Sequence, residues 1–167
     1  MHEAPDGVRT LLAPSDAVAE FVAGTYTFDR VEVVAVSVDR SAGGLVVEAG
    51  DLAAELTTGA RTGLGWALRA VPAPVARATW WCALIDPVAR RVVRGVRTRG
   101  TARDGRHEWY GATDQHRIVE IHATLGGVDL GALSDVWPPV RFGFGSAPRR
   151  PSVVAVNTTV RGMFDAP

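Results

Sequence analysis

The sequence contains no lysine, since all 18 of its basic residues are arginine. Lysine supplies the amine of Schiff-base and pyridoxal-phosphate enzymes, and it completes the Walker phosphate-binding loop. The absence of lysine therefore excludes all three kinds of chemistry.

Cysteine is almost absent and net charge is zero. Cys82 is the single cysteine, which excludes an intrachain disulfide and a zinc site built from several cysteines. The 18 acidic residues balance the 18 basic ones, so no overall field attracts nucleic acid or a membrane surface. We therefore expect neither nucleic acid nor a membrane among the partners.

Long apolar runs are also missing. No run approaches the ~20 residues of a membrane-spanning helix, and residues 1–20 lack the basic start and apolar stretch of a signal peptide. We expect a cytoplasmic protein, and the Arg-, Ala-, Val- and Gly-rich composition suggests a bacterial origin. The length of 167 residues fits a single domain over residues 1–167, with residues 1–14 loosely ordered.

One helix is predicted near the start of the chain. Ser15 can cap it, Val18, Phe21 and Val22 form an apolar stripe, and Gly24 can end it.

After this helix the pattern changes to the two-residue period of β-strands, with many β-branched and aromatic residues. Turn-forming residues, such as 41–44 and Asp86-Pro87, separate the stretches. Residues 61–77 interrupt the pattern, because their leucines have helical spacing while glycines and prolines limit the helix. They predict an irregular helical crossover. Strands are predicted at residues 25–39, 45–56, 79–86, 90–100, 107–113, 116–125, 140–144 and 151–164.

About eight strands joined by short turns predict an all-β fold, a single antiparallel up-and-down barrel. In strand number and in its leading helix the chain resembles the lipocalin or calycin group, and that resemblance implies a barrel that holds one small ligand. An α+β helix-grip fold is the alternative. That fold needs a long closing helix where residues 151–164 predict a strand.

The most suggestive stretch for chemistry is the strand predicted at residues 116–125. Its alternation places His116, Glu120 and His122 on one face. Glu120 could orient His122 as a general base, which makes these two the predicted catalytic residues. Two histidines and a carboxylate could also bind a metal, but the spacing matches no metal motif and none is predicted. Alternatively, this polar face simply faces water while the apolar face packs in the core.

Aromatic residues could form the wall of a ligand pocket. If the chain turns at residues 112–115, Trp109 and Tyr110 come near His116, so we predict all three to bind a ligand. Tyr26 and Trp81, on other predicted strands, are further wall candidates. Ordinary cross-strand packing is the alternative for each.

Arginine is concentrated between residues 90 and 106, where Asp104 is the single acid. The arginines fall on both faces of the strand predicted at residues 90–100 and in the turn that follows it, as in a solvated hairpin. A sharper interpretation is an anion site or a docking surface for an acidic carrier protein. The residues are Arg90, Arg91, Arg94, Arg97, Arg99, Arg103 and Arg106.

Three functional hypotheses follow. In the first, the barrel is a cofactor-independent cyclase or isomerase of bacterial secondary metabolism that orients a mostly apolar substrate and uses one acid–base group. In the second, it is a non-catalytic carrier or sensor for a hydrophobic small molecule. In the third, it is a structural or interaction domain whose barrel is filled by its own side chains, with the arginine hairpin as the docking surface. A homodimer is compatible with each, and no cofactor motif is present.

Overall fold

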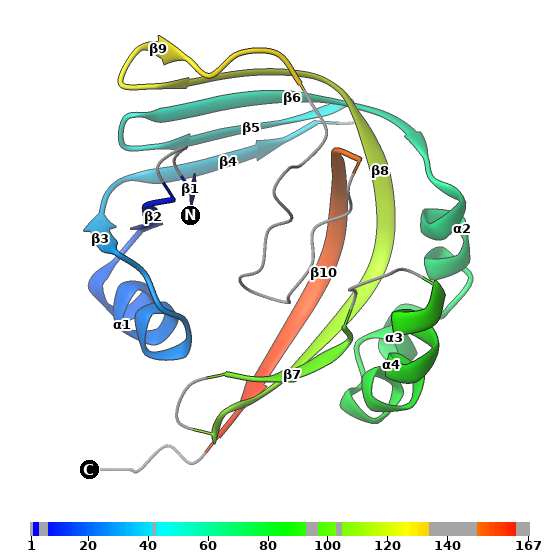
Figure 1. The fold of residues 1–167 in the computed structure, drawn as a ribbon. Coiled ribbons are helices and arrows are strands. Elements are labelled where there is room, and N and C mark those ends of the chain that lie inside the picture. Colours follow the sequence, from blue (N-terminus) through cyan, green and yellow to red (C-terminus); the bar gives the residue numbers. More distant parts are fainter. Residues whose placement is uncertain are drawn as a thin grey trace. The chain divides into compact units, whose positions relative to one another are not determined.

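The computed structural model of the protein describes residues 2–3, 7–41, 43–92, 97–102, 105–133 and 150–162. Figure 1 shows the elements coloured along the chain. In chain order they are β1 (His2–Glu3), β2 (Arg9–Ala13), α1 (Asp16–Thr25), β3 (Arg30–Val33), β4 (Val36–Arg40), β5 (Gly44–Ala49), β6 (Leu52–Arg61), α2 (Gly63–Arg69), α3 (Ala73–Ala76), α4 (Thr79–Val92), β7 (Arg99–Thr101), β8 (His107–Leu125), β9 (Val128–Asp129) and β10 (Ser152–Arg161).

The strands form two sheets. The smaller has the order β1-β2-β3, and the larger has seven strands in the order β10-β8-β6-β5-β4, with β7 and β9 also paired to β8. Within the described residues the outer strands β4 and β10 do not pair, so the larger sheet is open. The protein is therefore mostly β with an antiparallel sheet and helices, as predicted. Its closure into a lipocalin-like barrel is not confirmed.

Contacts divide the chain into two compact units. The first comprises Met1–Thr58 and Val119–Leu133, and the second comprises Gly59–Ile118 and Ser134–Pro167. Strands β6 and β8 each pass through both units. A single domain remains a prediction.

In the first unit, α1 confirms the helix predicted near the start of the chain. The Ser15 hydroxyl accepts a hydrogen bond from the backbone N–H of Val18 at 3.4 Å, as an N-cap residue does. The helix packs on β2, and the small core there consists of Leu11, Ala13 and Ala19, with Val22 and Phe28 against it.

The strand predicted at residues 25–39 is corrected into two strands of different sheets. Strand β3 pairs in parallel with β2, and α1 connects the two, which is a βαβ arrangement. Strand β4 instead begins the antiparallel hairpin β4-β5. A parallel pair does not occur in an up-and-down topology. The break between β3 and β4 was not predicted because β-branched residues continue through it.

The hairpins of the first unit follow the turn signals. Strands β4 and β5 form an antiparallel hairpin where residues 41–44 predicted a turn, and the Ser41 backbone N–H donates a hydrogen bond to the Gly44 carbonyl oxygen at 3.1 Å. The stretch predicted as one strand over residues 45–56 instead folds back on itself, because Gly50 adopts a φ of 56° and starts a turn into β6.

In the second unit, helices α2 and α3 confirm the irregular helical crossover predicted at residues 61–77. Two glycines let the helices approach β8 closely. A Cβ on Gly65 of α2 would lie 2.3 Å from the Gln115 carbonyl oxygen, and a Cβ on Gly111 of β8 would lie 2.4 Å from the Ala76 carbonyl oxygen. Close packing of backbone on backbone therefore fixes these helices on the strand.

Helix α4 corrects the strand predicted at residues 79–86. Trp80, Leu84 and Val88 recur every four residues, which is a helical spacing. The aromatic and β-branched content of the segment suggested a strand, and the spacing of its apolar residues was the better guide.

The predicted turn at Asp86-Pro87 also lies inside α4. The Asp86 side chain is only 3% exposed, and its carboxylate accepts a hydrogen bond from the backbone N–H of Thr98 at 2.9 Å. Arg90, one turn further along, pairs with the same carboxylate at 2.7 Å. These contacts compensate for the helical hydrogen bond that the proline cannot donate.

Strand β8 runs without a turn from His107 to Leu125, so the hairpin predicted at residues 112–115 is wrong. A register shift opposite Ala155 and Val156 leaves Thr113 as an extra residue in β8, which is a β-bulge. The polar residues there suggested a turn, but the bulge accommodates them within a paired strand.

The arginine hairpin predicted between residues 90 and 106 is wrong in part. Arg90 and Arg91 lie in the last turn of α4, where cations are favourable, and Arg99 begins β7. Arg94 and Arg103 lie outside the described residues, as does the strand predicted at residues 140–144. The final predicted strand is confirmed by β10.

Candidate functional site

The second unit contains a pair of buried, hydrogen-bonded ionisable side chains at the start of β8. Glu108 is 3% exposed and Tyr110 is 5% exposed. Because residues two apart on a strand share a face, both side chains lie on the same side of β8, and the Tyr110 hydroxyl donates a hydrogen bond to Oε2 of Glu108. A carboxylate and a phenol in contact are chemically able to exchange a proton with a third group.

Strand β8 is paired on both sides here: β10 places Val160 opposite Glu108 and Thr158 opposite Tyr110, whereas β7 places a glycine opposite Glu108. Gly100 of β7 is in register with Glu108, and a Cβ on it would lie 3.8 Å from the Tyr110 hydroxyl oxygen and 3.9 Å from Glu108 Oε2. Those are ordinary contact distances, so the pair borders a position that would accept at least a methyl group. We call Gly100, Glu108 and Tyr110 the Glu108 site.

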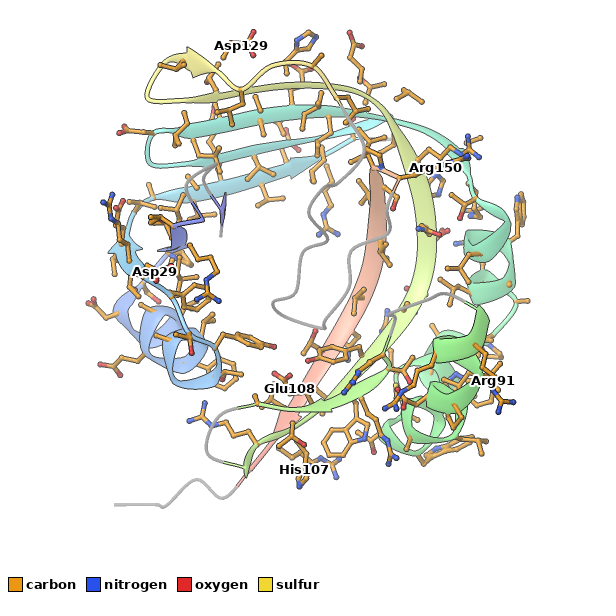
Figure 2. All side chains as sticks on the ribbon, in the orientation of Figure 1. Asp29, Arg91, His107, Glu108, Asp129 and Arg150 are labelled. Atoms are coloured by element: carbon orange, nitrogen blue, oxygen red, sulfur yellow. The ribbon has the colours of Figure 1, made fainter. Side chains whose placement is uncertain are left out.

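The opposite face of the same strand carries different residues. His107 and Trp109 lie with their ring centroids 6.1 Å apart, and the Arg161 guanidinium of β10 lies 5.8 Å from the Trp109 ring centroid. Figure 2 shows His107 and Glu108 on opposite sides of the strand. Trp109 therefore does not share the face of Tyr110, and the two do not form one aromatic wall.

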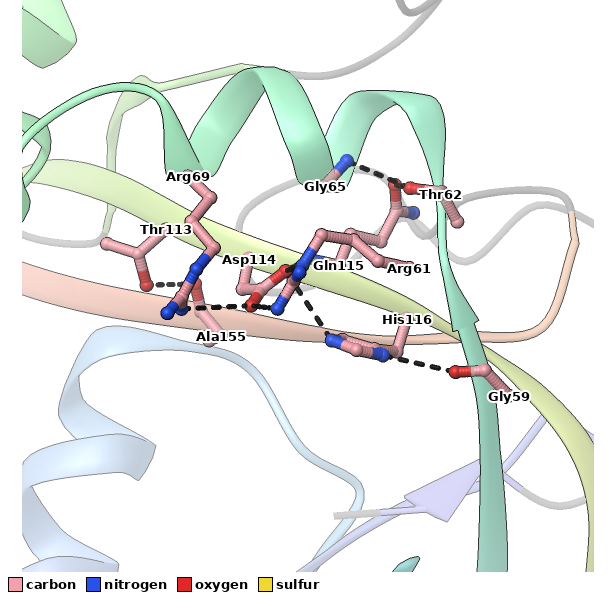
Figure 3. A network of polar contacts seen from close by, with 10 residues as sticks. All are labelled: Gly59, Arg61, Thr62, Gly65, Arg69, Thr113, Asp114, Gln115, His116 and Ala155. Carbon is pink, nitrogen blue, oxygen red and sulfur yellow. Dashed lines mark hydrogen bonds and ion pairs between the residues drawn. The ribbon is translucent and has the colours of Figure 1, made fainter. Parts of the chain in front are cut away.

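A second polar cluster, drawn in Figure 3, joins β6, α2 and β8. Asp114 accepts two hydrogen bonds from the Arg61 guanidinium, at 2.7 and 2.9 Å, and lies 3.7 Å from Nη1 of Arg69. His116 Nδ1 lies 3.1 Å from the Gly59 carbonyl oxygen, and its Nε2 lies 3.6 Å from Asp114. The charged and polar groups of Asp114, Arg61 and His116 find their partners within the cluster, so we interpret the cluster as structural.

The hydrogen bonds from Arg61 lower the pKa of Asp114 from 3.8 to about 2, although partial burial opposes this. A carboxyl whose pKa is lower in the folded state stabilises the fold above its unfolded pKa, and this contribution is lost as the pH falls from about 4 toward 2.

We therefore expect Asp114→Asn to lower the free energy of unfolding by about 1–2 kcal/mol at pH 7. The deficit should shrink as the pH approaches 2, because the wild-type carboxyl is then protonated as well. Urea unfolding at pH 7, 4 and 3 measures this. Asp39→Asn, on an exposed position of β4, is the control and should show little deficit; a deficit of Asp114→Asn that is independent of pH would contradict the assignment.

The predicted catalytic pair lies in the first unit. His122 Nε2 and Glu120 Oε1 are 3.2 Å apart, as the alternation predicts, but the side chains are 75% and 61% exposed. His116 belongs to the second unit. Among the residues that the structure describes, no three His, Cys, Asp or Glu side chains are grouped to hold a metal ion.

The two remaining predicted ligand residues, Tyr26 and Trp81, belong to different helical elements. Tyr26 is half-buried and caps the C-terminus of α1 through its backbone N–H. Trp81, also half-buried, lies on α4 and makes an edge contact with Trp80, with ring centroids 6.0 Å apart. Cys82 is buried, and its desolvation raises the pKa of the thiol, as expected for an unreactive cysteine.

Sequence reasoning missed Glu108 as a candidate. The alternation within residues 107–110 does place Glu108 on the face of Tyr110, and an acid beside aromatic residues on a strand is a usable signal. What the sequence could not show is that Gly100 lies in register with it, because that depends on the pairing of β7 with β8.

No protein-family model, curated protein or solved structure matches this chain. Its class rests on its own structure, a mostly β protein with an open antiparallel sheet and helices. Of the described helices, none combines the length and apolar character that crossing a membrane requires.

Proposed function

We propose that the protein binds a mostly apolar small molecule at the Glu108 site and isomerises or cyclises it without a cofactor. The observation that carries the proposal is the buried contact between Glu108 and Tyr110 beside a residue without a side chain. Closure of the sheet into a lipocalin-like barrel, a cytoplasmic location and a bacterial source belong to the proposal as well.

The chemistry assigned to the site is a proton shift. In an isomerisation, the Glu108 carboxylate takes a proton from one carbon of the substrate and returns it to another carbon of the same molecule, so that the double bond moves and no atom is gained or lost. The Tyr110 hydroxyl holds the carboxylate in place through its hydrogen bond. Such a reaction depends mainly on orientation and on one acid–base group, which suits a site built around the contact between Glu108 and Tyr110.

Glu120 and His122 form a competing acid–base assignment. Their side chains are in contact but exposed to water, and a general base works best where the substrate is held and water is excluded. We therefore place the chemistry at Glu108, and an activity assay separates the two assignments.

The assay uses a panel of β,γ-unsaturated ketones and epoxy alcohols, whose isomerisation or cyclisation leaves the mass unchanged and alters the chromatographic retention time. Glu108→Gln should lower the conversion rate at least 100-fold, within the range that a general base contributes, and Tyr110→Phe about tenfold. Glu120→Gln and His122→Ala should retain full activity. Loss of activity in this second pair alone would move the acid–base group to β8 of the first unit.

A non-catalytic carrier is the second candidate. It is favoured because Glu120 and His122, the acid–base pair predicted from the sequence, are exposed to water rather than enclosed with a substrate. A carrier would bind an apolar probe at the Glu108 site and convert no member of the panel.

A further inference from the structure

The exposed apolar side chains of the second unit are concentrated on its helices. Among the described residues of this unit, the exposed large hydrophobic side chains are Trp66 on α2 and Trp80, Leu84 and Val88 on α4. The three on α4 are 60%, 65% and 52% exposed and follow one another every four residues. We call these three the α4 ridge.

The α4 ridge has the form that helix packing uses. Side chains four residues apart make a ridge along a helix, and such a ridge fits the groove between the corresponding side chains of another helix. The other side of α4 is already occupied, because Cys82 and Asp86 are buried there. The ridge is therefore the apolar face that α4 leaves available.

The surroundings of the ridge are positively charged. Residues 63–92 contain four arginines and one acid. That acid is Asp86, which is buried and paired with Arg90. Arg77 and Arg91 are exposed and make no ion pair among the described residues. Arg91 follows Val88 by three residues, which continues the line of the ridge, and Figure 2 shows it on the side of α4 away from β8.

From these observations we propose that the α4 ridge is a docking surface for an acidic amphipathic helix of another protein. Its apolar face packs on Trp80, Leu84 and Val88, and its carboxylates meet the surrounding arginines. A second copy of this chain would bring two positively charged surfaces together, which is unfavourable. A ridge one side chain wide also offers less area for membrane insertion than the broad apolar face of interfacial helices.

The test uses a fluorescein-labelled 18-residue helical peptide with leucine along one face and glutamate and alanine elsewhere, and a matched peptide with lysine in place of glutamate. Fluorescence anisotropy with the full chain measures the Kd. We expect the glutamate peptide to bind, with affinity falling as salt rises, and the lysine peptide to bind at least tenfold more weakly.

Two variants locate the binding. Leu84→Glu should weaken binding of the glutamate peptide at least tenfold, and Arg91→Glu several-fold. Val128→Glu is the matched control, because Val128 is 67% exposed on β9 of the first unit. It should leave the Kd unchanged.

Three results would overturn the proposal: no binding of the glutamate peptide, equal binding of both peptides, or a Kd that Leu84→Glu leaves unchanged. Binding to phosphatidylglycerol vesicles that Leu84→Glu abolishes, without peptide binding, would assign the ridge to a membrane surface instead. A dimer in sedimentation analysis that Leu84→Glu dissociates, again without peptide binding, would assign it to a second copy.

Discussion

Gly65→Ala is expected to lower the free energy of unfolding by about 2–3 kcal/mol. The added methyl group would lie 2.3 Å from the carbonyl oxygen and 3.0 Å from the amide nitrogen of Gln115, and 2.7 Å from Cγ of Arg61. Two of these three atoms belong to the backbone of β8, so α2 must move away from the strand. That movement also strains the hydrogen bond from the Thr62 hydroxyl to the Gln115 side chain, at 2.8 Å.

The control is in the same helix. A Cβ on Gly63 would meet no atom within 4 Å, so Gly63→Ala should be neutral or slightly stabilising, because alanine favours helix more than glycine does. Urea unfolding monitored by circular dichroism compares the two variants. Equal stability of the two would show that α2 does not rest on β8 as described.

Asp86→Ala should lower the free energy of unfolding by about 2–3 kcal/mol, because it removes a buried carboxylate with several partners. Burial alone would raise the pKa of Asp86, but the hydrogen bonds from Thr98 and the charge of Arg90 outweigh it and the pKa is lowered. The carboxylate is thus stabilised in its charged form. Without it, the backbone N–H of Thr98 loses its acceptor, and the hydrogen bond from the Thr98 hydroxyl to the Cys82 carbonyl oxygen, at 2.6 Å, is left to join α4 to the chain that leads into β7.

Two variants make this prediction specific. Asp86→Asn keeps the shape and one acceptor oxygen, so it should lose less stability than Asp86→Ala. Glu20→Ala removes an exposed acid from α1 and should change stability little. Thermal unfolding of the three proteins gives the comparison, and a loss in Asp86→Ala no larger than in Glu20→Ala would contradict the role of the carboxylate.

Local signals predicted the elements that depend on neighbours in sequence. The Ser15 cap, the turn at residues 41–44 and the crossover at residues 61–77 are each defined within a few residues, and each is present. The strand that becomes β10 is likewise apparent from its β-branched residues.

Elements that depend on distant contacts were missed. In helix α4 the four-residue spacing of the apolar residues is a local helix signal, but Pro87 and two tryptophans disfavour a helix prediction, and the supporting contact of Asp86 with Thr98 lies outside the segment. The bulge at Thr113 is stabilised by pairing with β10, some forty residues later. The residue pattern of one segment does not show which distant residues it will contact or pair with.

The same limit applies to the site. Contact between Glu120 and His122 follows from a two-residue spacing, and the structure shows it. Their exposure does not follow, since it depends on what covers the strand. The burial of Glu108 and Tyr110 and the glycine opposite them likewise follow from packing and register.

The measurement that tests the central claim most directly is the binding of N-phenyl-1-naphthylamine, a neutral apolar fluorophore, to four proteins: wild type, Gly100→Leu, Gly100→Ala and Gly43→Leu. A leucine on Gly100 occupies the space beside Glu108 and Tyr110, whereas a Cβ on Gly43 meets no atom within 4 Å. We predict that Gly100→Leu weakens binding at least tenfold while its circular dichroism spectrum is unchanged, that Gly100→Ala has an intermediate affinity, and that Gly43→Leu matches wild type. Equal affinity in all four proteins would contradict a ligand site at Glu108.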